Sequence, residues 1–108
     1  MGVNMTVELF YGVKIKDSEK VDELRQKLEN EYISSYENRT IGYFSDCYSN
    51  KWVAVGKRLQ SSQDNRYDSQ DFFWECEVSE EDKAEVREYL NSKNIKGIPK
   101  LYCFTYYS

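Results

Sequence analysis

The segment from Leu101 to Tyr107 carries an aliphatic, aromatic or cysteine side chain at every position except Thr105. Successive side chains of a β-strand point to opposite faces of the sheet, and a strand with one face in water alternates apolar with polar residues. This segment lacks that alternation. It therefore predicts a strand with both faces covered, in a sheet that needs a helical layer on one side and a second cover on the other.

The length and composition indicate one small domain built around aromatic rings. The 108 residues fit a single domain, 1–108, with residues 1–4 expected to lie outside the fold. Aromatic residues make up 16% of the chain, and ten of them are tyrosines. Because a buried tyrosine hydroxyl needs a hydrogen-bond partner or water, this composition favours a thin layer of sheet and helix with many half-buried positions.

The hydrophobic period changes from 2 to 3.6 and back twice along the chain. Asp17-Ser18 and Ser79-Glu80-Glu81-Asp82 provide helix caps, and Pro99 prevents a second helix from continuing into the last strand. The polar stretch 60–71 reads as a loop. The predicted elements are a strand at Met5 to Lys16, a helix at Ser18 to Tyr36, a hairpin of Arg39 to Tyr48 with Lys51 to Leu59, a strand at Phe72 to Val78, a helix at Ser79 to Asn94, and a strand at Lys100 to Tyr107.

This order, β-α-β-β-β-α-β, predicts an α+β fold. It resembles the ferredoxin-like α+β sandwich with an extra strand, a resemblance that spans the whole chain and rests on element order alone. It implies a single-layer, mostly antiparallel sheet of about five strands with the two helices packed on one face. Fold analogy of this kind says little about function.

Composition excludes several kinds of chemistry. The chain has no histidine, and its three cysteines are far apart, so neither a zinc site nor a Cys-His nucleophile is expected, and we predict no cofactor and no metal. Cys47, Cys76 and Cys103 each lie in an apolar run and are expected to be buried, reduced thiols, which favours the cytoplasm. No stretch approaches the length of a membrane span, so no membrane partner is expected.

The candidate binding residues follow from strand alternation. If the odd-numbered residues of the first strand face the helices, Phe10 points to the other face, and alternation in the last strand brings Tyr102, Phe104 and Tyr106 to the same side. A ferredoxin-like order places these two strands side by side. The pattern predicts an aromatic patch that binds a partner. In the alternative interpretation, the 60–71 loop and residues 107–108 cover the rings and no partner is needed.

A second candidate contact lies in the polar loop, where Arg66 and Tyr67 form an adjacent cation and ring. Such a pair suits an acidic or planar group of a partner, although an idle surface pair explains it equally well.

These features lead to a functional hypothesis by elimination. We expect a small, acidic, non-catalytic protein-binding module, namely an inhibitor, adaptor or immunity-type protein of a bacterium or bacteriophage, which binds another protein or itself as a homodimer. The alternatives are binding of a nucleotide or single-stranded nucleic acid on the aromatic face, which the net charge of −4 disfavours, and a small enzyme with carboxylate or tyrosine chemistry.

Overall fold

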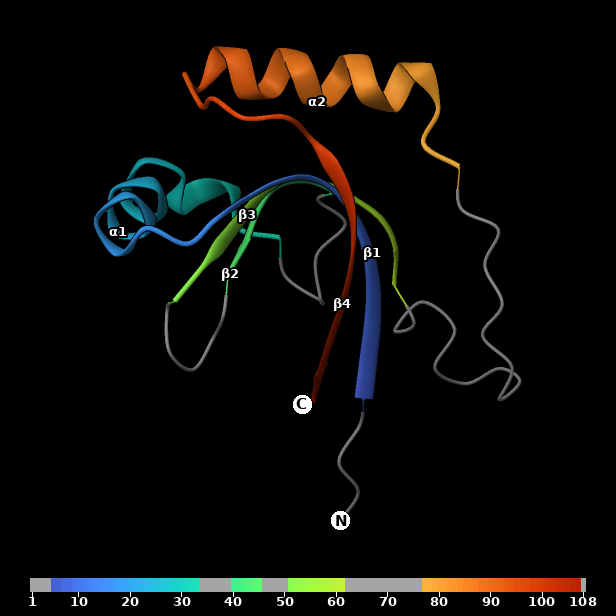
Figure 1. Cartoon of the computed structure of the whole chain (residues 1–108), viewed down its shortest axis with the longest axis horizontal. Helices are drawn as coiled ribbons and strands as arrows, with labels where there is room; N and C mark the ends of the chain where they lie inside the picture. Colours follow the sequence, from blue (N-terminus) through green and yellow to red (C-terminus); the bar gives the residue numbers. More distant parts are fainter. Residues whose placement is uncertain (1–4, 34–39, 46–50, 62–76, 108) are drawn as a thin grey trace.

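Four strands and two α-helices alternate along the chain in the computed structural model, which describes residues 5–33, 40–45, 51–61 and 77–107 (Figure 1). The elements are β1 (Met5–Ile15), α1 (Ser18–Lys27), the short 3-10 helix η1 (Glu29–Glu31), β2 (Ile41–Ser45), β3 (Val53–Ser61), α2 (Glu80–Ser92) and β4 (Lys100–Tyr107). The predicted α+β class is confirmed, as are the hairpin of β2 and β3 and the last strand.

The strands form one antiparallel sheet in the order β2-β3-β1-β4. The sequence predicted about five strands, whereas the described residues form four. Most of the fifth predicted strand, 72–76, lies outside the described residues, and Glu77 and Val78 at its end are not in a strand. The first and last strands are neighbours in this order, so β1 lies at the centre of the sheet beside β4.

The first helix is shorter than the periodicity predicted. Backbone N–H groups of Glu19 and Lys20 donate to the Asp17 carboxylate at its start, but α1 ends at Lys27 instead of Tyr36. After η1 the chain turns extended, because Tyr32 forms a parallel bridge with Tyr43 and the N–H of Ile33 donates to the Tyr43 carbonyl. Pairing with β2 thus overrides the helical pattern.

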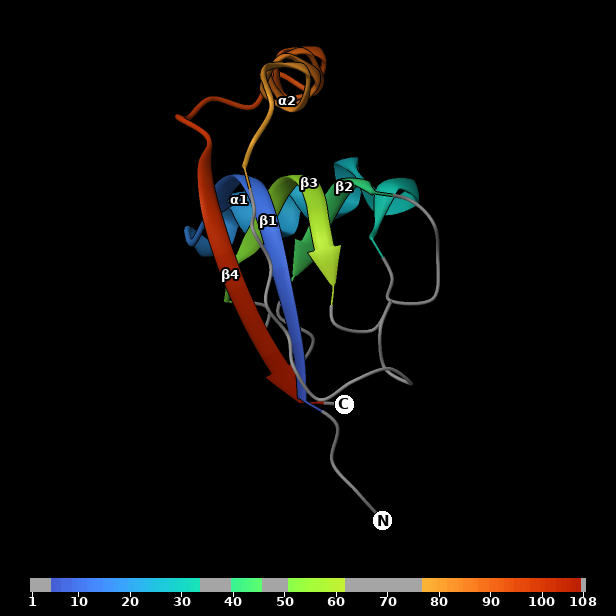
Figure 2. The same ribbon diagram turned by 90° about the vertical axis from the view of Figure 1, so that its right-hand side faces the viewer.

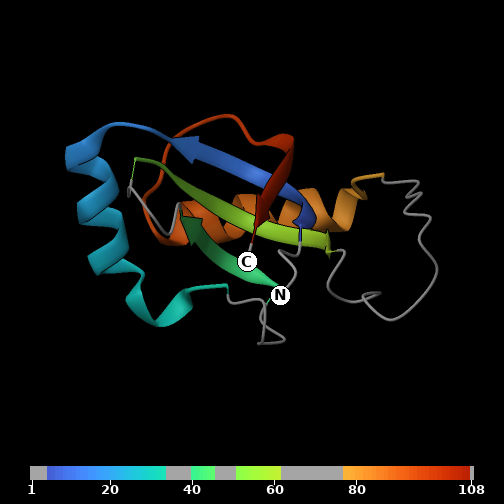
Figure 3. The ribbon, with the colours of Figure 1, turned by 90° about the horizontal axis from the view of Figure 1, so that it is seen from below.

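The main core lies between the sheet and both helices. Figures 2 and 3 show α2 and α1 against the sheet, with α2 behind the strands when the molecule is seen from below. Side chains from both helices share one buried cluster with inward residues of β1, β2 and β3. Its members are Val13, Val21, Leu24, Leu28, Tyr43, Val53, Val55, Val86, Leu90 and Ile95.

A second core lies on the face of the sheet turned away from these helices. Phe10, Phe44, Ala54 and Phe104 are buried there together, and Ile33 joins them from the segment after η1. This cluster explains why the strands are apolar on both faces: each face of the sheet has its own core.

Glycines allow the sheet to curl around this second core. Gly12 pairs with Gly56, which also pairs with Gly42, so three glycines form a row across β1, β3 and β2. A Cβ added at Gly12 would lie 2.1 Å from the Val55 carbonyl oxygen, and one at Gly56 would lie 2.2 Å from that of Tyr11. Without side chains the strands approach closely at this row, and Figure 1 shows β1 and β3 strongly arched.

Candidate partner-binding surfaces

The aromatic face is the set of rings on the side of the sheet opposite the helices: Phe10, Phe44, Trp52, Tyr102 and Phe104. Strand register brings them together, because Phe10 lies opposite Tyr102 in the pairing of β1 with β4, and Glu8 lies opposite Phe104. Phe10, Tyr102 and Phe104 thus occupy one face, as strand alternation predicted.

Phe104 is the centre of this face. Its ring packs nearly parallel to Trp52, with a centroid distance of 5.0 Å and an interplanar angle of 8°. It stacks on Tyr102 at 5.7 Å and meets the edge of Phe10 at 5.9 Å. The Nζ of Lys14 lies 5.0 Å from the Trp52 centroid and 5.9 Å from that of Phe104. The cation and the rings form one packed group.

Burial limits what these rings offer to a partner. Phe10 is 0% exposed and Phe104 is 9% exposed. Tyr102 and Trp52 are partly buried and pack against the cluster from its border. The accessible part of the aromatic face is therefore Trp52, Tyr102 and the Lys14 ammonium, while the two phenylalanines belong to the core.

Three other predicted residues are not placed at a site. Tyr106 lies in β4 opposite Thr6, and its side chain lies outside the described part of the structure. Arg66 and Tyr67 also lie outside the described residues.

A buried ion pair borders the aromatic face. β3 has a β-bulge at Leu59. Leu9 lies opposite Gln60 but Phe10 lies opposite Arg58, so Leu59 is the extra residue in the pairing. This bulge turns Arg58 to the side of Glu8. The Arg58 Nη1 and Glu8 Oε1 atoms are 3.6 Å apart, with side chains only 9% and 2% exposed. Because both side chains are nearly buried, loss of either partner would leave a buried charge, so the pair has a structural role.

The helix-facing side of β4 is more open than the sequence indicated. Leu101 and Cys103 lie opposite Tyr11 and Leu9, and Cys103 was expected to be buried. Leu101 is 47% exposed, and Cys103 is an exposed free cysteine. The prediction of a buried Cys103 is wrong because α2 packs mainly over β3 and does not cover this edge. Cys47 and Cys76 lie outside the described residues.

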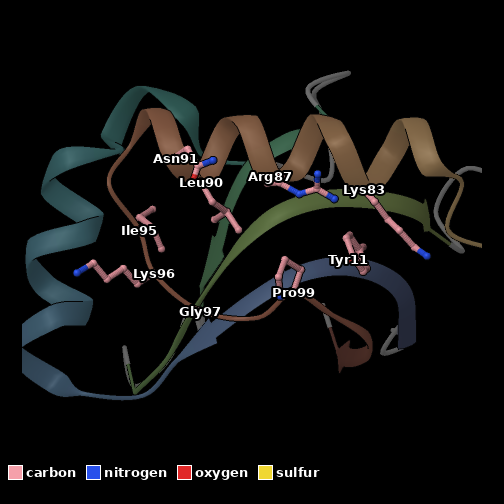
Figure 4. A pocket seen from close by; sticks show the side chains of 9 residues that line it. All are labelled: Tyr11, Lys83, Arg87, Leu90, Asn91, Ile95, Lys96, Gly97 and Pro99. Atoms are coloured by element: carbon pink, nitrogen blue, oxygen red, sulfur yellow. The ribbon is translucent and has the colours of Figure 1, made fainter.

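A pocket of about 310 Å³ opens beside this edge, between α2 and the segment that leads into β4 (Figure 4). We call it the α2–β4 groove. Its lining residues are Tyr11, Lys83, Arg87, Leu90, Asn91, Ile95, Lys96, Gly97 and Pro99. Figure 4 shows Lys83 and Arg87 extending along the side of α2 that faces Tyr11 and Pro99. Three of the nine lining residues are cations and none is a carboxylate.

Two acids of α2 are paired on the flank of the helix away from the groove. The Lys57 Nζ bonds Asp82 Oδ1 at 2.7 Å and Glu85 Oε2 at 2.9 Å, on the flank of α2 above β3. Hydrogen bonds to these carboxylates raise the pKa of Lys57, and the bond from Lys57 lowers the pKa of Asp82. The acids of α2 are thus partly neutralised on one flank.

The other flank holds cations with weaker pairing. Lys83 and Arg87 stand four residues apart and so share one side of the helix. Lys83 has a 3.4 Å contact with Glu80, whose side chain is 88% exposed, and a pair so exposed to solvent contributes little. The groove is therefore a positive region in a chain of net charge −4.

Sequence reasoning missed this groove. The sequence does show Lys83 and Arg87 four residues apart and the apolar residues Ile98 and Leu101 around Pro99. It does not show that they border one groove, because the groove depends on where α2 lies relative to β4.

Among the described residues, no helix is long and apolar enough to cross a membrane, and no group of three or more potential ligands stands ready to hold a metal ion. Comparisons with family models, with curated proteins and with solved structures found no match to this chain.

Proposed function

We propose that this protein is a non-catalytic protein-binding module. The observation that carries the proposal is the pair Ile98 and Leu101, which are 81% and 47% exposed on either side of Pro99. They are the large exposed hydrophobic residues in the described part of the chain. Single exposed apolar residues are ordinary, but two of them beside a groove lined by Arg87, Lys83 and Lys96 combine apolar surface with an arginine, a residue enriched at interfaces.

The fold and setting are part of the same proposal. The order β2-β3-β1-β4 with all neighbours antiparallel, together with a helix after β1 and another before β4, supports the ferredoxin-like part of the proposal. The exposed free thiol of Cys103 supports a reducing compartment, the cytoplasm. Small size and acidity favour an inhibitor, adaptor or immunity-type role in a bacterium or its virus.

The aromatic face supports a second candidate function, the binding of a planar ligand such as a nucleotide. The supporting observation is the Lys14 ammonium over Trp52, beside the partly accessible Tyr102. Stacking of this kind binds bases without sequence preference. Titration with single-stranded oligonucleotides, followed by tryptophan fluorescence, tests this candidate function. The Ile98→Asp variant leaves the aromatic face intact and should bind the oligonucleotides as wild type does.

The leading proposal is tested by affinity capture from a lysate of the native cells, followed by mass spectrometry and reconstitution with the purified candidate partner. The reconstituted complex should weaken at least tenfold on Leu101→Asp, since a charge at an interface centre is left unpaired. Gln26→Asp, an equal change in charge at an exposed residue of α1, is the matched control. Equal binding by wild type and Leu101→Asp contradicts the proposal.

A further inference from the structure

The β4 strand has an edge that is not paired with another described strand, and exposed side chains on its α2 side. In the sheet of the described residues it is the outermost strand beyond β1, so its second edge has no partner strand among them. Its side chains Leu101 and Cys103 are exposed on the face toward α2. An edge of this kind accepts an added strand through backbone hydrogen bonds, at about 4.8 Å from β4.

The α2–β4 groove lies beside this edge and determines which strand fits. Tyr11, which lines the groove, is the cross-strand neighbour of Leu101. A strand added to β4 directs every second side chain to the α2 side of the sheet. On that side lie Leu101, opposite Tyr11, and the groove that Lys83 and Arg87 line.

We propose that the α2–β4 groove binds an extended acidic segment of another protein, which adds to β4 as a further strand. Apolar side chains of the segment cover Leu101 and Ile98, and its carboxylates pair with Arg87 and Lys83. This inference rests on the proposed function and specifies the chemistry of the partner. The Arg guanidinium is suited to it because it binds a carboxylate in two-point fashion.

Charge argues against a second copy of the chain as the occupant. Two copies joined edge to edge through β4 bring the cations beside one strand close to those beside the other, among them Lys96 and Lys100. Like charges across an interface disfavour association. A segment rich in Asp or Glu gains from the same cations.

The probe is the synthetic peptide Val-Thr-Glu-Thr-Val-Thr-Glu-Thr with a fluorescent label, in which valine and glutamate share one face of the strand. Its matched control is the same peptide with lysine in place of glutamate. Fluorescence anisotropy with the full chain at low salt should show the acidic peptide binding at least tenfold more tightly than the basic one. Equal binding of the two peptides overturns the proposal.

Charge reversal on the protein locates the site. Arg87→Glu should weaken the acidic peptide about tenfold or more, whereas Lys20→Glu, an equal change in net charge on an exposed residue of α1, should have less than a twofold effect. Both residues are exposed, so both variants should fold, which circular dichroism verifies. Equal losses in the two variants overturn the proposal, because they show a response to net charge alone.

Backbone methylation tests the added strand. Successive N–H groups of a strand point to opposite edges, so methylation of the odd-numbered peptide nitrogens (valine and glutamate) and methylation of the even-numbered ones (threonine) block opposite edges. One of the two methylated peptides should lose binding and the other should keep it. Loss in both or in neither overturns strand addition.

Two further outcomes separate this inference from the proposed function. If sedimentation shows a dimer that Leu101→Asp dissociates, the occupant is a second copy and the acidic partner is ruled out. If the reconstituted partner depends on Leu101 but the acidic peptide does not bind, the module binds protein by another mode, so the inference fails while the proposed function survives.

Discussion

At the scale of single residues, burial separates the rings of the aromatic face into two kinds. Alternation in the sequence placed Phe10, Tyr102 and Phe104 on one side of the sheet, and the register of β1 with β4 shows them there. It did not reveal that Phe10 and Phe104 are almost fully enclosed, because enclosure depends on the curl of the sheet and on rings from β2 and β3.

Phe104 should therefore behave as a core residue. Replacement by alanine removes a ring that contacts Phe10, Trp52 and Tyr102, and should lower the free energy of unfolding by about 3–5 kcal/mol. Thr105→Ala, an exposed neighbour, should change it by less than about 0.5 kcal/mol. Urea denaturation followed by fluorescence measures both. A loss below about 1 kcal/mol for Phe104→Ala would contradict the assignment of this ring to the core.

At the scale of elements, local patterns predicted the segments that depend on neighbours in sequence. β4 has the predicted bounds, and α2 starts after the predicted cap, where the Asp82 N–H donates to the Ser79 hydroxyl. The pattern failed for the end of α1, where long-range pairing of Tyr32 with Tyr43 competes with helix formation. The same limit applies to α2: its position over β3, where Val86 and Leu90 pack into the core and Lys57 pairs with Asp82, leaves the β4 edge uncovered.

The attachment of α2 to β3 should depend on pH. The folded pKa of Asp82 lies below its ordinary value of 3.8, so the stability it contributes is present above that pH and is lost as the pH falls through the folded pKa. The folded pKa of Lys57 lies above its ordinary 10.5, so its contribution is present below that pH and is lost as the pH rises through the folded pKa.

The measurement compares wild type with Lys57→Met by urea denaturation from pH 2 to pH 11. The wild type should be more stable by no more than about 1 kcal/mol near neutral pH, since solvent screens the pair. The difference should shrink below about pH 3.8 and above about pH 10.5. A difference that stays constant over the whole range would show that the ion pairs do not hold the helix.

At the scale of the whole molecule, the sheet has a core on each face, and the large exposed hydrophobic residues of the described part, Ile98 and Leu101, lie beside the edge strand β4. The class, the antiparallel sheet and the two helices follow from hydrophobic period and caps. The α2–β4 groove does not, since its walls come from β1, α2 and the segment before β4, and no local pattern fixes their spacing.

The claim that this edge is the partner-binding surface is tested most directly by hydrogen–deuterium exchange of the reconstituted complex, read by mass spectrometry. Binding should slow exchange of the amides at 95–105 and at 83–91, which flank the groove, and leave 41–45 and 53–55 unchanged. Protection confined to 41–45 and 53–55, beside Phe44 and Trp52, would instead assign the partner to the aromatic face and contradict the account.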